Sequence, residues 1–221
     1  MFYKTKLYLN LIKYFFKDKF KIIEKEESLA FLKNYFKDKK NGFYIDAGCY
    51  HPIRLSNTKF LHDKGWEGIN IDISKKSIDL FNIVRKKDIN LILGLSDKEG
   101  IANAYFEKDL FFQNTINYAY KKKFLSEKSK KKNIEIKTLN YVIKKYTKNK
   151  IIDLIDVDCE GQDLNVLKGL DLTKHNVRMI LIEVHRYNDE IKKNAHQIFE
   201  ILKANNYKLL FSGHNCIFKK D

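Results

Sequence analysis

The sequence is poor in the residues that cross-link small secreted domains or break regular structure. It contains one proline and nine glycines, and its three cysteines, Cys49, Cys159 and Cys216, include no Cys-x-x-Cys pair. This odd, scattered set predicts neither a disulfide framework nor a structural zinc site, and it is typical of the reducing cytoplasm. We therefore expect a cytoplasmic protein that is stabilised by an apolar core, which 221 residues suffice to build.

Long hydrophobic runs are also missing. Lys6, Asn10, Lys13 and Lys17 interrupt the apolar residues near the start, so no stretch approaches the roughly 20 residues that a membrane-spanning helix needs. No small-residue cleavage site of the kind found in signal peptides follows. The basic, amphipathic residues 7–23 could lie on a membrane surface, but packing against the core or against a second subunit of a homodimer is favoured.

Positive charge is in excess, with 43 Lys and Arg against 28 Asp and Glu, a formal net charge of +15. Such a charge suits an anionic partner: nucleic acid, phospholipid or a phosphorylated substrate. The chain lacks the arginine-rich or aromatic-interleaved basic stripe on which bases stack, so nucleic acid is not the expected partner. The densest basic run, residues 121–133, predicts a solvated helix face or a mobile loop.

Apolar runs of strand length alternate with segments of helical periodicity. We predict a helical N-terminal extension over residues 1–40 and one domain over 41–221, with an irregular stretch between the third strand and the helix that starts at Thr138. The expected strands cover residues 43–48, 68–73, 89–96, 151–158 and 178–185, with two more in 207–220. Nearly continuous apolar strands separated by helices predict an α/β fold, a parallel sheet covered on both faces.

Acidic residues follow the expected strands at the point where each ends. Ligands of such sheets bind outside the carboxyl ends of the strands, which makes the following residues candidates: Asp46, Gly48, Asp72, Ser96, Asp97, Asp158, Glu160, Glu183 and His185. Asp72 lies 24 residues after Gly48, where an acid can accept both hydroxyls of an adenosine ribose. The further glycines of a dinucleotide-binding turn are absent. The pattern favours an adenosine ligand without phosphates, and S-adenosylmethionine fits because acids complement its cationic groups.

Three segments resemble one family in matching order. The stretches "FYIDAGCYHPIRLSNTKFLHDKGWEGINIDIS", "IDLIDVDCEGQDLNVLKGLDL" and "RMILIEVH" are similar to the FkbM family of S-adenosylmethionine-dependent methyltransferases. The resemblance implies a Rossmann-like class I methyltransferase fold with a mostly parallel seven-stranded sheet. It also implies O-methylation of a sugar or a polyketide-type molecule, often in capsule or other surface-polysaccharide pathways, and thus a sugar or nucleotide-sugar acceptor.

The same resemblance implies positions for the cofactor. Residues Asp46, Gly48, Ser56, Asn57 and Thr58 would surround its methionine end, although Ser56 and Thr58 could instead cap a helix. Asp72 would lie at its ribose, and Ser96 and Asp97 would lie beside its adenine. Asp158 is also expected to bind the cofactor.

A sugar hydroxyl is a weak acid, so methyl transfer needs a base or a metal near the acceptor oxygen. One hypothesis makes His185 or Asp158 the general base. The other places Mg²⁺, Mn²⁺ or iron among Asp158, Glu160, Glu183 and His185, a mixed oxygen and imidazole set that suits these metals. Glu160 could instead be a carboxylate that is stabilised by the N-terminus of the next helix, and His185 could be a structural histidine. His51 is interpreted as a packing or gating residue.

Residues 103–133 are expected to form a lid or acceptor loop, in which Lys121–Lys123 would meet the phosphates of an activated sugar. Two other classes stay open. An RNA methyltransferase could use the basic surface, although no added RNA-binding module or base-flipping motif is present. The second class is a binding protein that has kept the fold but does not catalyse a reaction. The intact acids at every strand end count against it.

Overall fold

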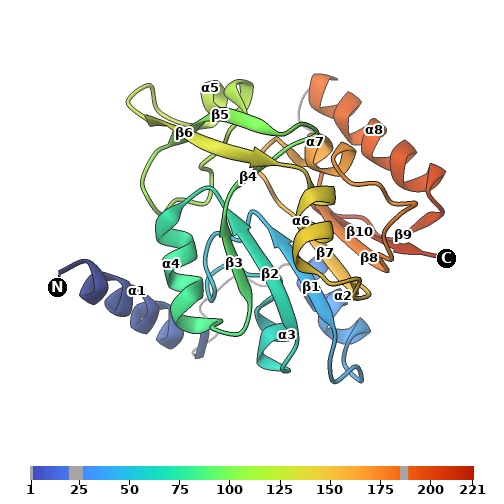
Figure 1. The fold of residues 1–221 in the computed structure, drawn as a ribbon, viewed down its shortest axis with the longest axis horizontal. Coiled ribbons are helices and arrows are strands. Elements are labelled where there is room, and N and C mark those ends of the chain that lie inside the picture. The colour runs from blue at the N-terminus through green and yellow to red at the C-terminus, as the bar shows by residue number, and fades with distance from the viewer. Residues whose placement is uncertain (1, 20–26, 185–188) are drawn as a thin grey trace.

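The computed structural model describes residues 2–19, 27–184 and 189–221. Its main sheet has seven strands in the order β3-β2-β1-β7-β8-β10-β9 (Figure 1). The strands are β1 (Phe43–Ala47), β2 (Glu67–Asp72), β3 (Ile89–Ile92), β7 (Leu154–Val157), β8 (Met179–Glu183), β9 (Tyr207–Phe211) and β10 (Asn215–Lys220). β10 runs antiparallel to both of its neighbours, β8 and β9, and the other adjacent strands of this sheet are parallel. The predicted fold, a mostly parallel seven-stranded Rossmann-like sheet, is confirmed.

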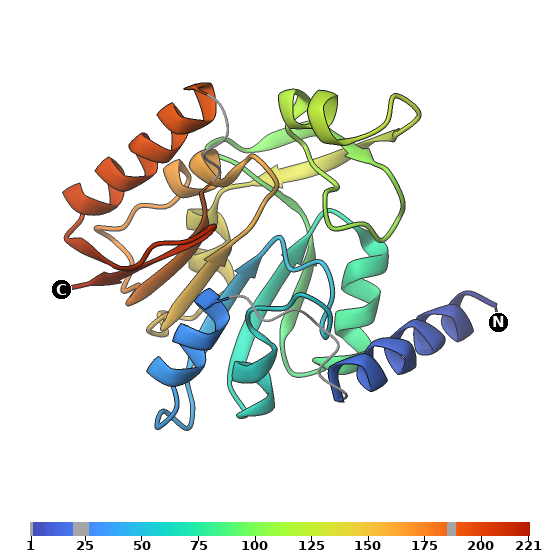
Figure 2. The same ribbon diagram turned by 180° about the vertical axis from the view of Figure 1, so that it is seen from behind.

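Helices cover both faces of this sheet (Figure 2). One face carries α2 (Glu27–Tyr35), α3 (Lys59–Asp63) and α4 (Lys75–Val84), and the other carries α6 (Leu139–Tyr146), α7 (Asp163–Lys168) and α8 (Asp189–Ala204). Successive side chains of β1 point to opposite faces of the sheet, so they pack in two separate parts of the core. Tyr44 packs with Leu32 and Leu61 on the α2 and α3 side, whereas Ile45 belongs to the larger cluster that includes Val142 of α6.

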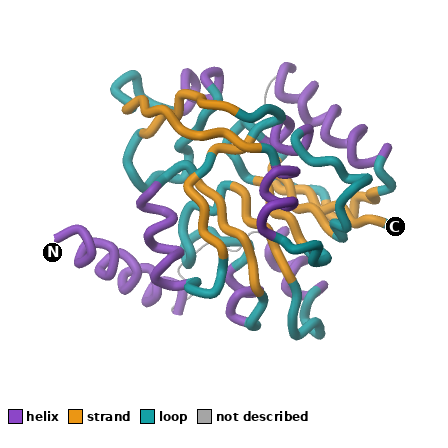
Figure 3. The backbone as a smooth tube through the Cα atoms, viewed as in Figure 1, coloured by secondary structure: helices purple, strands orange, loops and turns teal. Residues whose placement is uncertain are grey.

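A second sheet of three strands stands beside the carboxyl ends of the main sheet, and Figure 3 shows the two as separate groups of strands. It contains β4 (Gly94–Leu95), β5 (Gly100–Phe106) and β6 (Lys130–Lys137), with α5 (Tyr118–Phe124) between the last two. The expectation of an irregular stretch here was wrong. β6 is largely exposed and rich in lysine, and β5 is exposed mainly in its first half, so neither has the burial of a strand that is covered on both faces.

The first helix, α1 (Phe2–Lys19), packs on the outside of α4. Leu7 and Leu11 are buried against Leu80 of α4 and Ile53. No helix in the described ranges is long and apolar enough to cross a membrane. The division of the chain at residue 40 stays a prediction.

Candidate active site

The turn after β1 requires glycine at position 48. Gly48 has φ +88°, and a Cβ atom there would lie 1.7 Å from the carbonyl oxygen of Asp158. The backbone N–H of Asp158 in turn donates to Ala47 O at 2.9 Å. A positive φ and this close approach are both conditions that only glycine meets without strain. The ends of β1 and β7 are thereby held in contact.

A small cavity, here called the strand-end cleft, opens at this contact. It has a volume of about 40 Å³ and is lined by Gly48, Asp72 and Asp158 at the strand ends, by Leu93–Leu95, and by Phe111 and Phe112. Ser96 and Asp97 directly follow this lining; Ser96 is half-buried and Asp97 is exposed.

Asp72 is oriented by backbone donors. Its carboxylate accepts the N–H groups of Tyr50 (2.8 Å) and Ser74 (2.6 Å). Burial raises the pKa of Asp72 to about 6, and the two backbone hydrogen bonds oppose that shift. A carboxylate held in this way at the end of the second strand can accept ribose hydroxyls.

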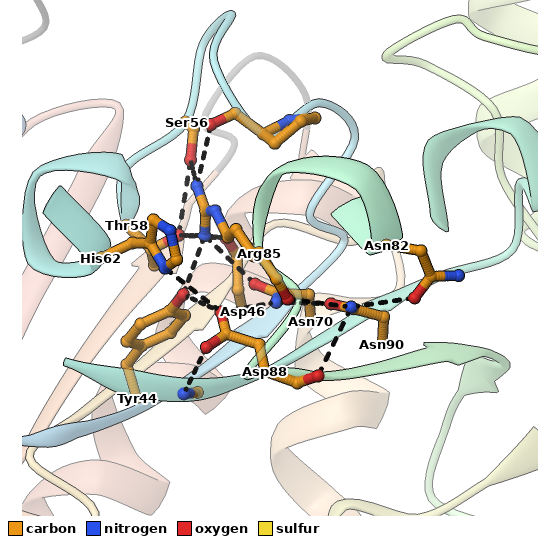
Figure 4. A network of polar contacts seen from close by, with 12 residues as sticks. Tyr44, Asp46, Ser56, Thr58, His62, Asn70, Asn82, Arg85, Asp88 and Asn90 are labelled. Carbon is orange, nitrogen blue, oxygen red and sulfur yellow. Dashed lines mark hydrogen bonds and ion pairs between the residues drawn. The ribbon is translucent and has the colours of Figure 1, made fainter. Parts of the chain in front are cut away.

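Asp46, Ser56 and Thr58 belong to a buried polar network centred on Arg85, shown in Figure 4. The Arg85 guanidinium donates to Ser56 Oγ (2.8 Å), Thr58 Oγ1 (2.8 Å) and the carbonyl oxygen of Pro52 (3.0 Å). Thr58 Oγ1 donates to Asp46 Oδ2 at 2.5 Å. Thr58 occupies the N-cap position of α3 without a capping hydrogen bond from its side chain, so its hydroxyl serves this network.

The network extends across the sheet through β1 and β2. Arg85 also donates to Tyr44 Oη (3.0 Å) and Asn70 Oδ1 (3.2 Å). Asp88 accepts from both of these side chains, at 2.5 Å from Tyr44 Oη and 3.0 Å from Asn70 Nδ2. Arg85 and its partners thus attach residues 52–58 to the underlying strands.

A larger cavity of about 290 Å³, here called the acidic cavity, adjoins the strand-end cleft. Gly48, Phe112, Asp158 and Glu160 line both. Apart from Leu55, the remaining lining is polar or aromatic: Tyr50, Asn57, Gln113, Tyr120, Phe124, Glu183, His214 and Asn215. The structure therefore brings together three of the four predicted acceptor-site residues, and it places Asn57 and Gln113 with them.

The carboxylates of the acidic cavity raise one another's pKa. Burial and the neighbouring charges of Glu183 and Glu160 raise the pKa of Asp158 well above its usual value. Burial and Glu183 also raise the pKa of Glu160 to about 8, against the opposing hydrogen bond that Glu160 Oε2 accepts from the Tyr120 hydroxyl. Glu183 Oε1 lies 2.8 Å from His214 Nε2. Carboxyl groups with raised pKa values are stronger bases than ordinary ones.

The fourth predicted residue, His185, lies outside the described residues. Within the part of the chain that is described, no group of three or more His, Cys, Asp or Glu side chains is arranged to hold a metal ion. The metal hypothesis and the predicted roles of the individual site residues stay predictions.

Loop residues hold the cavity from the side of the second sheet. Thr115 Oγ1 donates to the carbonyl oxygen of Glu160 (2.8 Å), and Asn117 Nδ2 donates to that of Gly161 (2.7 Å). Glu160 itself has a positive φ of 50°, and these contacts stabilise that conformation. The predicted lid or acceptor loop is accordingly part of the cavity wall.

Sequence reasoning missed Arg85, Tyr120 and His214. Arg85 ends α4, where a basic residue is usually interpreted as a solvated C-terminal charge. Tyr120 stands in an otherwise lysine-rich helix, and His214 lies in the turn between the last two strands. Only the position of that turn at a strand end could have signalled His214.

The predicted methyltransferase family is tested by comparison with known proteins. The family model described as "Methyltransferase FkbM domain" matches residues 46–209, which is most of the chain. This chain belongs to that family. The FkbM-domain protein is therefore a methyltransferase, and its family implies S-adenosylmethionine as the methyl donor.

No similar sequence is found among the curated proteins. Two solved structures resemble the FkbM-domain protein at 11% sequence identity. One is a protein from Clostridium thermocellum proposed to be an rRNA-methylase, with a TM-score of 0.47 and coverage of 90% of this chain and 99% of that one. The other is a TehB-like SAM-dependent methyltransferase from Corynebacterium glutamicum, with a TM-score of 0.42 and 87% coverage of both chains.

The strand-end cleft has the chemistry that S-adenosylmethionine needs. Asp72 and Asp158 place carboxyl oxygens in the cleft, which would suit ribose hydroxyls and cationic groups, and Leu93 and Phe111 give it apolar walls that would suit adenine. The cleft of about 40 Å³ continues into the acidic cavity of about 290 Å³ through Gly48, Phe112 and Asp158.

Proposed function

We propose that this protein methylates a hydroxyl oxygen of a sugar, carried by a nucleotide or a glycan, in surface-polysaccharide biosynthesis. The observation that carries the proposal is the acidic cavity, which meets the strand-end cleft at Gly48 and Asp158. Carboxylates and amides in this cavity suit sugar hydroxyls as hydrogen-bond partners. Aromatic side chains such as Tyr50 and Phe112 suit the apolar faces of a sugar ring.

Asp158 is the group that we assign to proton transfer, because it lines both cavities. When bound, S-adenosylmethionine supplies an electrophilic methyl group. In its ionised form Asp158 would accept the proton of the acceptor hydroxyl while the methyl group passes from the donor's sulfur to that oxygen and the methyl–sulfur bond breaks. Its raised pKa makes this carboxylate a stronger base. Glu160 and Glu183, held by Tyr120 and His214, orient the other hydroxyls of the sugar.

A neighbouring cavity of about 190 Å³ offers a place for the activating group of the acceptor. It shares Tyr120, Phe124 and Glu183 with the acidic cavity, and Lys123 of α5 also lines it. Lysines suit phosphate as compact point charges. This location supports a nucleotide-linked or phosphorylated sugar as the acceptor.

The test is incubation of the purified protein and labelled S-adenosylmethionine with a panel of nucleotide-linked sugars, free sugars and RNA, with and without chelator. We expect a mass gain of one methyl on a nucleotide-linked sugar. A chelator-resistant rate supports Asp158 as the base, whereas loss of the rate supports a divalent ion among the carboxylates. Methylation confined to RNA would overturn the proposal in favour of an RNA methyltransferase.

The contribution of the α5 lysines is tested separately by replacing Lys121–Lys123 with alanine. If they meet acceptor phosphates, the acceptor KM rises about tenfold or more, with little change in kcat. The matched control replaces Lys86 and Lys87, which are exposed beyond the end of α4. An unchanged KM in the α5 variant would remove the phosphate contact from the proposal.

A further inference from the structure

Helix α1 has two apolar faces, and only one of them is used by the fold. Leu7 and Leu11 are buried against α4. On another side of the same helix Leu9, Ile12 and Phe16 are 61%, 52% and 53% exposed. Their spacing of three and four residues places them in one line along the helix. Phe2, Tyr8 and Phe15 are also exposed and widen this line into what we call the outer stripe.

Lysines accompany the outer stripe. The 18 residues of α1 contain five lysines and a single acid, Asp18. Lys4, Lys6, Lys13 and Lys17 are all exposed, and their helical positions fall on the two sides of the stripe. Exposed aromatic and aliphatic side chains bordered by lysines are the pattern of helices that lie in the interface of a bilayer.

We propose that α1 docks the protein on an anionic phospholipid surface through the outer stripe. The stripe would enter the boundary between headgroups and acyl chains, and the lysines would contact lipid phosphates. A second copy of the chain is the less suitable occupant. Two outer stripes packed face to face would bring their bordering lysines together, and like charges at close range repel.

Docking through α1 would act on a wall of the acidic cavity. Asn10 Oδ1 of α1 accepts a hydrogen bond from His51 Nε2 at 2.8 Å, because His51 Nδ1 already accepts the N–H groups of Ile53 and Arg54. Burial lowers the pKa of His51 to about 3, so the His51 imidazole stays neutral at physiological pH.

Arg54 completes the connection. Its guanidinium lies 5.4 Å from the ring centre of Tyr14 in α1, and it donates to the Tyr50 hydroxyl at 2.7 Å. Tyr50 lines the acidic cavity. The bound helix would therefore be connected, through Arg54, to a residue that lines the acidic cavity.

The test is flotation of the full-length protein with equimolar phosphatidylcholine and phosphatidylglycerol vesicles, and with phosphatidylcholine vesicles alone. We expect stronger binding to the anionic vesicles, which weakens as salt rises because the lysine charges are screened. The double variant Ile12→Glu/Phe16→Glu should have an affinity for the anionic vesicles that is at least about tenfold lower than that of the wild type. The control Ile101→Glu changes a side chain that is 78% exposed on β5, and it should bind as the wild type does.

Folding of the stripe variant is checked by circular dichroism and by S-adenosylmethionine binding, since the buried face of α1 is unchanged in it. Three results would overturn the proposal. The wild type could fail to prefer anionic vesicles, or the stripe variant could bind them as the wild type does. Light scattering could instead show a dimer that the stripe variant converts to a monomer, which would assign the stripe to a second copy.

Discussion

The guanidinium of Arg85 lies 3.9 Å from the carboxylate of Asp46, and both side chains are buried. Burial raises the pKa of Asp46, while Arg85 and the hydrogen bond from Thr58 oppose that shift. The acid at the end of the first strand is therefore committed to an internal contact. Through Arg85 it positions residues 52–58, which include Asn57 in the wall of the acidic cavity.

Removal of Arg85 should destabilise the protein strongly. Arg85→Ala leaves Asp46 buried without its cation, and we expect the free energy of unfolding to fall by about 3 to 5 kcal/mol. Urea denaturation measures this change. The control is Arg178→Ala. Arg178 is half-exposed, and its partner Asp153 would still form an ion pair with Lys39, whose Nζ lies 2.8 Å from Asp153 Oδ1. That loss should stay below about 1 kcal/mol. Equal losses in the two variants would contradict the assigned role.

Gly48→Ala should disrupt the contact between β1 and β7. The new Cβ would lie 1.7 Å from Asp158 O, so the two strand ends must separate and the affinity for S-adenosylmethionine should fall at least about tenfold. Gly65→Ala is a matched control, since Gly65 has φ +86° and nothing within 4 Å of a Cβ. It should cost about 1 kcal/mol of stability and leave the affinity unchanged. Calorimetric titration measures the affinity, and wild-type binding by Gly48→Ala would refute the prediction.

Asp158→Asn tests the general base. The amide keeps the size of the side chain but cannot accept the proton, so kcat should fall between about a hundredfold and ten-thousandfold. Single-turnover methylation of the identified acceptor measures the chemical step. Asp109→Asn provides the control, because Asp109 is exposed and pairs only loosely, at 3.5 Å, with Lys132. A rate loss below about threefold in Asp158→Asn would exclude Asp158 as the base.

Glu160 should make stability depend on pH. Its pKa is raised from 4.5 to about 8 in the folded protein, so between these values the folded state binds more protons than the unfolded state. The free energy of unfolding then falls as pH rises, by at most about 1.4 kcal/mol per pH unit from this group. Glu160→Gln cannot titrate, and its stability relative to the wild type should increase from pH 4.5 to pH 8. Urea denaturation across this range measures the difference, and a pH-independent difference would contradict the assignment.

Much of the site follows from patterns that are local in the sequence. The apolar run Ile180–Ile182, for example, identifies a strand that is buried on both faces. Parallel strands end at one edge of a sheet, so acids that follow different strands must lie near one another. This reasoning was sufficient to place Asp158, Glu160 and Glu183 together, and it depends only on residue order.

The sequence by itself thus determined the seven-stranded sheet, the family and the acidic edge. Tertiary structure alone decided that Arg85 is buried, that β5 and β6 pair into a second sheet, and that Tyr120 and His214 complete the acidic cavity. Arg85 contacts residues 15 to 41 positions away. Contacts at such separations leave no periodic pattern of residues in the sequence, because they form only when the packed elements bring their side chains together.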